Sequence, residues 1–269
     1  MRPPSGLRAC LGRATPWLAS AFMLAGNGVA AQTAASGSGT ASASASAADA
    51  ALEAQWVKTG LYLITGGGGN SLLRLSAVGS ILVDGKQAGQ HRALMSQVRR
   101  ISRLSDLPIR VLVVTDHHAH HTADLAPFRA AGVAVLAQEN ARQRLPIAAE
   151  TPASGSKVPG PVIGFERDYK LRIGGVAVDL FHFGSGHTDN DTVVLFPDLK
   201  VVAVGDLFTT GTPLPDVASG GSLAGWSSVL EQVLKLDFEL VVPGNGPIVG
   251  RAELMSLKSR IDELIARSR

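Results

Sequence analysis

The sequence predicts an α+β fold, a four-layer αββα sandwich in which two mixed β-sheets are flanked by helices. Two observations lead to this prediction. Apolar runs with the spacing of strands and of helices follow one another, and the same order then repeats in the second half of the chain. Strands and then helices, given twice, suit two sheets packed together with the helices outside. About 215 residues from position 55 onward are enough for one domain with a large core.

In the first half of the chain, runs of β-branched and other apolar residues predict the strands. The longest segment between two of these runs, 88–104, has apolar residues at helical spacing and predicts a helix. Leu94, Val98, Ile101 and Leu104 fall on one face of that segment. Gly132 closes the next helix. The predicted elements are a strand at 57–65, a hairpin of 71–76 and 80–84, a helix at 88–104, a strand at 110–114, a helix at 122–131 and a strand at 133–137.

In the second half, turn residues separate the strands, and Ser222 is a suitable N-cap. The predicted elements are two hairpins (169–173 with 176–183, and 192–196 with 201–204), a helix from 222 to 236, a strand at 239–242 and a helix at 251–267. The glycine run Gly66–Gly69 is not followed by the Lys-Ser or Lys-Thr pair of a phosphate-binding loop. We therefore expect a flap or tight bend there. Residues 151–164 predict a long loop or lid. Three segments are candidate determinants of substrate specificity: Gly66–Asn70, 151–164 and 209–226.

Residues 1–31 have the pattern of a secretory signal peptide. Three arginines precede an apolar segment, and small residues at 29–31 form a cleavage site. Residues 32–54 are rich in Ala, Ser and Gly and predict a flexible linker. The folded domain is therefore expected at 55–269, in a periplasmic or secreted protein with no membrane insertion after cleavage. The single cysteine, Cys10, lies in the leader, so thiolate ligands are excluded from the mature chain.

The charge balance of the mature chain argues against nucleic-acid binding. Of the 25 basic residues, three lie in the leader, which has no acidic residue, so 22 basic residues match 22 acidic ones. No basic excess remains for nucleic acid or for a membrane surface. The expected partner is a small-molecule substrate, and the sequence leaves the oligomeric state open.

The segment VLVVTDHHAHHTAD at 111–124 contains four of the seven histidines. They follow a buried strand, so they fall on a loop that a rigid sheet positions, where functional groups usually lie. His187 follows a second strand in a glycine-bracketed loop, and Asp206 ends a third. Imidazole and carboxylate groups from three strand ends suit zinc, iron or manganese.

These segments resemble the metallo-β-lactamase superfamily. The features that match are the histidine loop, Gly-Ser-Gly-His-Thr at 184–188, Val-Gly-Asp-Leu at 204–207 and Val-Pro-Gly-Asn-Gly-Pro at 242–247. The family motif is His-x-His-x-Asp-His, whereas this chain has Asp116 at the first ligand position and His120 at the aspartate position. Asn245 stands where the last ligand loop of the family has histidine.

The resemblance implies two groups of metal ligands. Asp116, His118 and His187 would hold one ion. His120, His121 and the bridging Asp206 would hold a second, with Asn245 as a weak ligand, since an amide oxygen binds zinc poorly. The implied cofactor is one or two zinc ions, with iron or manganese as alternatives.

The implied function is hydrolysis, in which a metal-bound hydroxide attacks the carbonyl of an ester, thioester, lactone or amide, β-lactams included. Asp206 and His120 are the predicted catalytic residues, with His120 as general base or acid because imidazole titrates near neutral pH. The altered ligands leave two alternatives open. One is a non-catalytic or weakly active protein that binds a ligand or metal, and the other is an iron-dependent redox enzyme on the same fold.

Overall fold

The computed structural model describes residues 51–102, 108–146 and 158–268. The predicted signal peptide and most of the predicted linker lie outside these ranges. No helix within them combines the length and the apolarity needed to cross a bilayer.

The first sheet has seven strands in the order β1-β2-β3-β4-β5-β6-β7. Neighbouring strands run antiparallel from β1 to β4, and β4 to β7 are parallel. The sheet is therefore mixed. Its strands are β1 (Glu53–Lys58), β2 (Leu61–Thr65), β3 (Ser71–Ser76), β4 (Gly79–Val83), β5 (Ile109–Val113), β6 (Ala134–Gln138) and β7 (Val162–Phe165).

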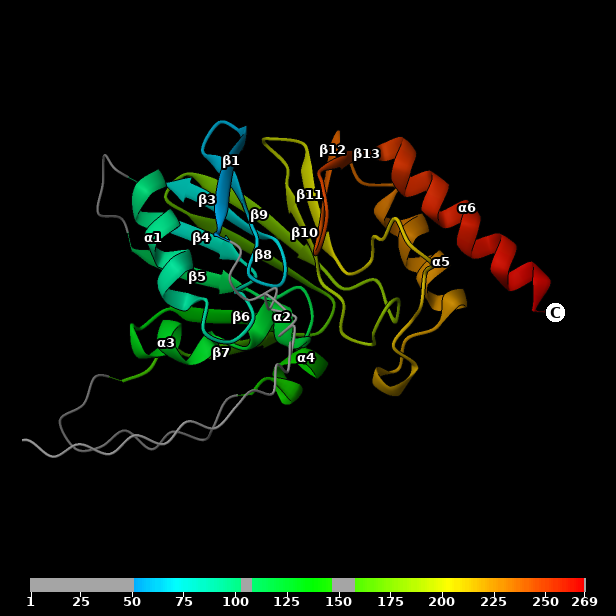
Figure 1. The fold of residues 1–269 in the computed structure, drawn as a ribbon, viewed down its shortest axis with the longest axis horizontal. Helices are drawn as coiled ribbons and strands as arrows, with labels where there is room; N and C mark the ends of the chain where they lie inside the picture. The colour runs from blue at the N-terminus through cyan, green and yellow to red at the C-terminus, as the bar shows by residue number, and fades with distance from the viewer. Residues whose placement is uncertain (1–50, 103–107, 147–157, 269) are drawn as a thin grey trace, which may run out of the picture. The chain divides into compact units, whose positions relative to one another are not determined.

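The second sheet has six strands in the order β13-β12-β11-β10-β9-β8, and only β11 and β12 are parallel. Figure 1 shows this sheet in yellow-green to orange beside the first one. Its strands are β8 (Asp168–Ile173), β9 (Val176–Phe181), β10 (Val193–Phe196), β11 (Val201–Gly205), β12 (Leu240–Pro243) and β13 (Val249–Gly250).

Helices cover the outer face of each sheet. Leu94 and Val98 of α1 and Phe128 of α3 pack in one apolar cluster with the first sheet. Trp226 of α5 and Leu257 of α6 pack in another with the second sheet. The four-layer αββα sandwich of two mixed sheets is thus confirmed. The helices are α1 (His91–Ile101), α2 (Ala119–Thr122), α3 (Leu125–Ala130), α4 (Glu139–Arg144), α5 (Leu223–Val233) and α6 (Arg251–Arg267).

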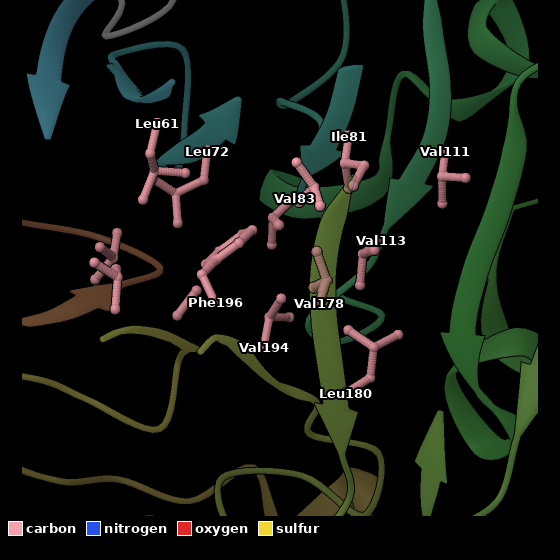
Figure 2. Close-up of a cluster of buried hydrophobic side chains, with 14 of the residues drawn as sticks. Leu61, Leu72, Ile81, Val83, Val111, Val113, Val178, Leu180, Val194 and Phe196 are labelled. Atoms are coloured by element: carbon pink, nitrogen blue, oxygen red, sulfur yellow. The ribbon is translucent and has the colours of Figure 1, made fainter. Parts of the chain in front are cut away.

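A third apolar cluster fills the space between the two sheets. Figure 2 shows Leu61, Leu72 and Val83 of the first sheet on one side, with Val194 and Phe196 of the second facing them. All five are almost completely buried. Burial of this apolar area is the main force that holds the two sheets together.

Replacing Phe196 with alanine is expected to lower the free energy of unfolding by about 3–5 kcal/mol, because the ring is fully buried and its loss leaves a cavity. Urea denaturation of the purified protein measures this change. Val78→Ala, at an exposed position in the turn before β4, should change the stability by less than about 0.5 kcal/mol. A similar small effect at both positions would contradict the assignment of Phe196 to the core.

Four predicted elements were wrong in detail. The strand predicted at 57–65 is a hairpin of β1 and β2, because Gly60 adopts a left-handed conformation (φ 68°) that turns the chain. Strand β1 begins at Glu53, so the folded part starts inside the predicted linker. The helix predicted at 122–131 is two short helices, α2 and α3. The lid predicted at 151–164 includes the start of β7, which pairs with β6, while 147–157 lie outside the described residues.

A candidate metal centre at the strand ends

Four strands deliver most of the polar residues of the site, and His187 lies on the loop between β9 and β10. Parallel strands β4 and β5 end next to Asp84 and to the histidine loop. Parallel strands β11 and β12 end next to Asp206 and Asn245. Because parallel neighbours end at the same edge of a sheet, each sheet places its polar residues together. The structure therefore gathers side chains that are up to about 160 residues apart in sequence.

Asp116 shapes the start of the histidine loop. Its Oδ1 accepts a hydrogen bond of 2.8 Å from the backbone N–H of His118, which begins the single turn of α2. Thr122 closes this turn by donating its hydroxyl to the carbonyl of His118 (2.9 Å). The tight turn places His118, His120 and His121 near one another.

The histidines form two groups around one carboxylate. His118, His187 and Asp206 each offer a ligand atom within 4.8 Å of the other two, and so do His120, His121 and Asp206. Asp206 Oδ2 lies 3.4 Å from His118 Nδ1 and 3.1 Å from His120 Nε2. Its Oδ1 lies 3.3 Å from His121 Nε2. Asp206 thus lies between both groups, where a bridging carboxylate would be.

Asp116 lies beside both groups but belongs to neither of them. Its Oδ1 is 3.1 Å from His118 Nδ1, and its Oδ2 is 3.7 Å from His121 Nε2. The side chain is 1% exposed. A buried carboxylate needs a cation or strong donors nearby, so its position suits a charge partner or ligand of a bound ion.

These side chains fit a metal ion. Buried atoms that have no hydrogen-bond partner in the structure include Asp116 Oδ2, His118 Nδ1 and His187 Nδ1. Leaving such atoms unsatisfied is costly, and a carboxylate oxygen and imidazole nitrogens are suitable ligands for zinc, iron or manganese. The donor set is two histidines with a carboxylate in each group.

The loop that carries His187 is held by hydrogen bonds to Asp191. This buried carboxylate accepts from the hydroxyl of Thr188 (2.7 Å) and from the backbone N–H of Gly186 (3.2 Å). The ring of Trp226 packs edge-on against His187, with 5.3 Å between the centroids, and its indole N–H donates to the carbonyl of Leu207. Burial lowers the pKa of His187, which favours the neutral imidazole that a metal requires.

The carboxylates change the protonation of the site when no metal is bound. The carboxylates of Asp116 and then of Asp206, at 3.1 Å and 3.4 Å from Nδ1, raise the pKa of His118 to about 10, although burial opposes them. Burial would raise the pKa of Asp206, but the contacts with His118, His120 and His121 outweigh it and hold that pKa far below its usual range. The metal-free protein therefore holds a proton on His118 at neutral pH.

Metal uptake is expected to release at least one proton between pH 6.5 and 10. His118 is protonated in the metal-free fold over this window, and the metal needs the free Nδ1. The apparent metal affinity should rise roughly tenfold per pH unit for each proton displaced. Calorimetry at pH 7 in buffers of different ionisation enthalpy counts the protons. A heat of binding that is independent of the buffer would contradict this expectation.

Two carboxylates that the sequence prediction missed contact the histidines from outside. Asp84 Oδ2 lies 3.0 Å from His121 Nδ1 and accepts the hydroxyl of Thr115. Asp216 Oδ2 lies 3.3 Å from His118 Nε2. Asp84 is the last residue of the strand predicted at 80–84. A carboxylate at the end of a predicted strand was also the signal that identified Asp206. Asp216 lies in a Pro-containing loop with no such signal, and it also forms a third group with His117 and His118.

Asp216→Asn is expected to weaken metal binding by about 10–100-fold, the usual effect of removing the outer carboxylate partner of a ligating histidine. The Ser219 hydrogen bond and then that of His118 lower the pKa of Asp216 to about 2, so it is a carboxylate at all working pH values. Competition with a chromogenic chelator measures the metal affinity. Asp179→Asn, which removes a surface ion pair with Arg172, is the matched control. Equal affinities in the two variants would exclude this role of Asp216.

The glycine run 66–69 forms a tight bend that is anchored to the loop after β12. Asn70 donates through its side chain to the carbonyls of Pro243 and Gly246 (both 2.9 Å). The buried ammonium of Lys86 donates to the carbonyls of Ile64 and Gly69. A Cβ at position 69 would lie 3.2 Å from the His120 ring and 3.1 Å from the Gly244 carbonyl, so glycine allows the bend to reach the site.

A cavity of about 360 Å³ opens beside the two groups. His187 and Asp206 are among the residues that line it. Asn245 is exposed and lines the same cavity, so the structure brings it to the site, but no contact with a histidine is present. Trp226, in the segment 209–226 that was a candidate substrate determinant, both packs in the core and lines the cavity.

Comparisons with known proteins show the family of this chain. The sequence profile of the metallo-beta-lactamase superfamily matches residues 64–245. The chain is 26% identical over 214 residues to metallo-beta-lactamase type 2 of Bacillus cereus, covering 74% of this chain and 76% of that protein. It is 25% identical over 206 residues to the type 2 enzyme of Bacillus sp. (strain 170), with the same coverage.

Solved structures share the fold. The metallo-beta-lactamase from Pontibacter korlensis gives a TM-score of 0.65 at 22% identity, over 78% of this chain and 99% of that one. FIM-1 from Pseudomonas aeruginosa, solved in its mono-zinc form, gives a TM-score of 0.65 at 21% identity, over 81% and 97%.

Proposed function

We propose that this chain, which belongs to the metallo-β-lactamase superfamily, is an exported metal-dependent hydrolase of esters, thioesters, lactones or amides. The observation that carries the proposal is the position of Asp206 between two histidine pairs, next to an open cavity. Zinc is the proposed cofactor, with iron or manganese as alternatives that the same donors accept.

Each residue has a distinct task in this proposal. His118 and His187, with Asp206, would hold one ion, and His120, His121 and Asp206 would hold a second. A divalent cation supplies Lewis acidity, which activates water and polarises a carbonyl oxygen. Asp116 balances the charge of the site from its buried position, and Asp84 and Asp216 orient His121 and His118.

The position of His120 supports a ligand role over that of general base. Its Nε2 lies 3.1 Å and 3.2 Å from the two oxygens of Asp206, so the ring points into the site. A nitrogen that ligates a metal has no lone pair left to accept a proton. Proton transfer then falls to Asp206 or to the solvent in the cavity.

The first experiment is metal analysis of the mature protein, expressed without a histidine tag and dialysed against metal-free buffer. We expect about one or two equivalents of zinc, iron or manganese per chain, and metal-dependent hydrolysis of activated esters, lactones or a chromogenic β-lactam. Hydrolysis by the metal-free protein at the same rate would overturn the proposal. Bound metal with no hydrolysis of any of these substrates would favour a non-catalytic metal-binding protein.

Export to the periplasm or the medium is part of the proposal, supported by the leader sequence at 1–31. Sequencing the N-terminus of the protein from a native host tests it. A mature chain that begins at Gln32 is expected, and a chain that keeps the leader in the cytoplasm would contradict export.

A further inference from the structure

The cavity beside the ligands has an uncharged wall. Apart from His187 and Asp206, its described lining consists of threonines, apolar side chains, Asn245 and Gly246, and it includes no lysine or arginine. Thr209, Thr210 and Thr212 form one side, and Phe208, Leu214 and Trp226 provide the apolar surface. Such a wall binds aliphatic groups and hydrogen-bonding groups, but it has no partner for an anion.

The nearest arginine on this wall faces away from the cavity. Arg260 of α6 donates to the carbonyls of Thr209 (2.8 Å), Thr210 (3.3 Å) and Gly211 (2.8 Å). Its guanidinium lines a separate cavity on the other side of residues 210–213. Three bonds to neighbouring carbonyls fix this segment, so Arg260 holds the wall rigid and contributes no charge to the cavity.

The carboxylates around the ligands offset the charge of two divalent ions. Asp116 and Asp206 together carry two negative charges, and Asp84 and Asp216 add two more, at 3.0 Å from His121 and 3.3 Å from His118. A substrate carboxylate in the cavity would therefore meet no unbalanced cation while it loses its hydration. Burying an unpaired carboxylate in this way is unfavourable.

Leu214 marks where the apolar part of a substrate would lie. It lines the cavity and yet is 70% exposed, and Val217 three residues later is 73% exposed. Large apolar side chains at the mouth of a cavity are typical of a surface that an apolar ligand covers. The threonine hydroxyls of the same lining can hydrogen-bond neutral oxygen atoms.

From these observations we infer that the site selects uncharged acyl substrates with an aliphatic group and disfavours those with a carboxylate near the scissile bond. Thr209 is the position that decides this selection, because it is half-buried, lies three residues after Asp206 and is fixed by accepting the Gly211 N–H (3.1 Å). The inference rests on the proposed hydrolase function and narrows its substrate class.

The test compares two hydroxamic acids of equal length by calorimetry on the zinc-loaded protein. Hexanohydroxamic acid ends in a methyl group, and adipic acid monohydroxamate ends in a carboxylate. We expect the neutral compound to bind at least about tenfold more tightly. Thr209→Lys should shift this ratio by about tenfold or more toward the carboxylate, and Thr209→Met, which adds length without charge, should leave it within about threefold.

The outcomes separate this inference from the proposed function. A wild-type protein that binds both compounds equally, prefers the carboxylate, or binds neither with a Kd below about 1 mM would overturn the inference. An unchanged ratio in Thr209→Lys would do the same. Preference for the neutral compound without hydrolysis of neutral esters would support the inference and contradict the hydrolase proposal alone.

Discussion

Replacing Asp206 with asparagine is expected to remove metal from both histidine groups and to reduce hydrolysis by more than about a hundredfold. This loss exceeds the effect of about 10–100-fold that is usual when the outer carboxylate partner of a ligating histidine is removed. Asp206 is the one carboxylate shared by the two groups. Asparagine keeps the size of the side chain but replaces an anionic oxygen with an amide, which is a poor ligand for zinc.

Metal analysis after dialysis, together with ester hydrolysis, measures this effect. Asp262→Asn is the matched control, since Asp262 is exposed on α6 and pairs only with Lys258 and Ser227. Far-ultraviolet circular dichroism should be the same for both variants, because Asp206 follows the end of β11 and its side chain forms no ladder bond. Full metal content in Asp206→Asn would refute the shared position of this carboxylate.

The sequence was sufficient to predict the layers of the fold because strand and helix periodicities are local. The α6 boundaries, Arg251–Arg267, agree with the prediction, and Ser222 caps α5 by accepting the N–H of Gly225. The hairpin of β8 and β9 was also visible, since two glycines separate two apolar runs. The predictions were wrong where one long apolar run contains a turn, as at Gly60, and where a predicted helix is two short helices, as at 122–131.

The candidate site could be predicted only as far as strand ends are visible. His118, His121, His187 and Asp206 each follow an apolar run, and the structure brings them into the two groups that share Asp206. Asp216 gave no signal because its contact with His118 joins loops that are 98 residues apart. The sequence also could not predict that the cavity wall is uncharged, because this depends on the direction of the Arg260 side chain.

His120→Ala is expected to remove one ion and leave the other, and thereby to distinguish a ligand from a general base. His120 Nε2 contacts both oxygens of Asp206, while His118 and His187 form the other group without it. The second group would keep only His121 and the shared carboxylate, which is too few ligands for tight binding. We therefore expect the metal content to fall by about half if wild type holds two ions, with at least about a tenfold loss of kcat.

A general base would give a different result. If His120 only transferred protons, the alanine variant would keep the wild-type metal content, and kcat would fall by about 10²–10⁴-fold with loss of one limb of the pH profile. His91→Ala is the control, because His91 belongs to none of the histidine groups and instead begins α1 and packs against Phe128. Full activity in His120→Ala would exclude both roles. In that case His118, His187 and Asp206 would form the metal site that supports activity. Asp116 would balance the charge of this site, whereas the first motif of the superfamily has its aspartate at the position of His120.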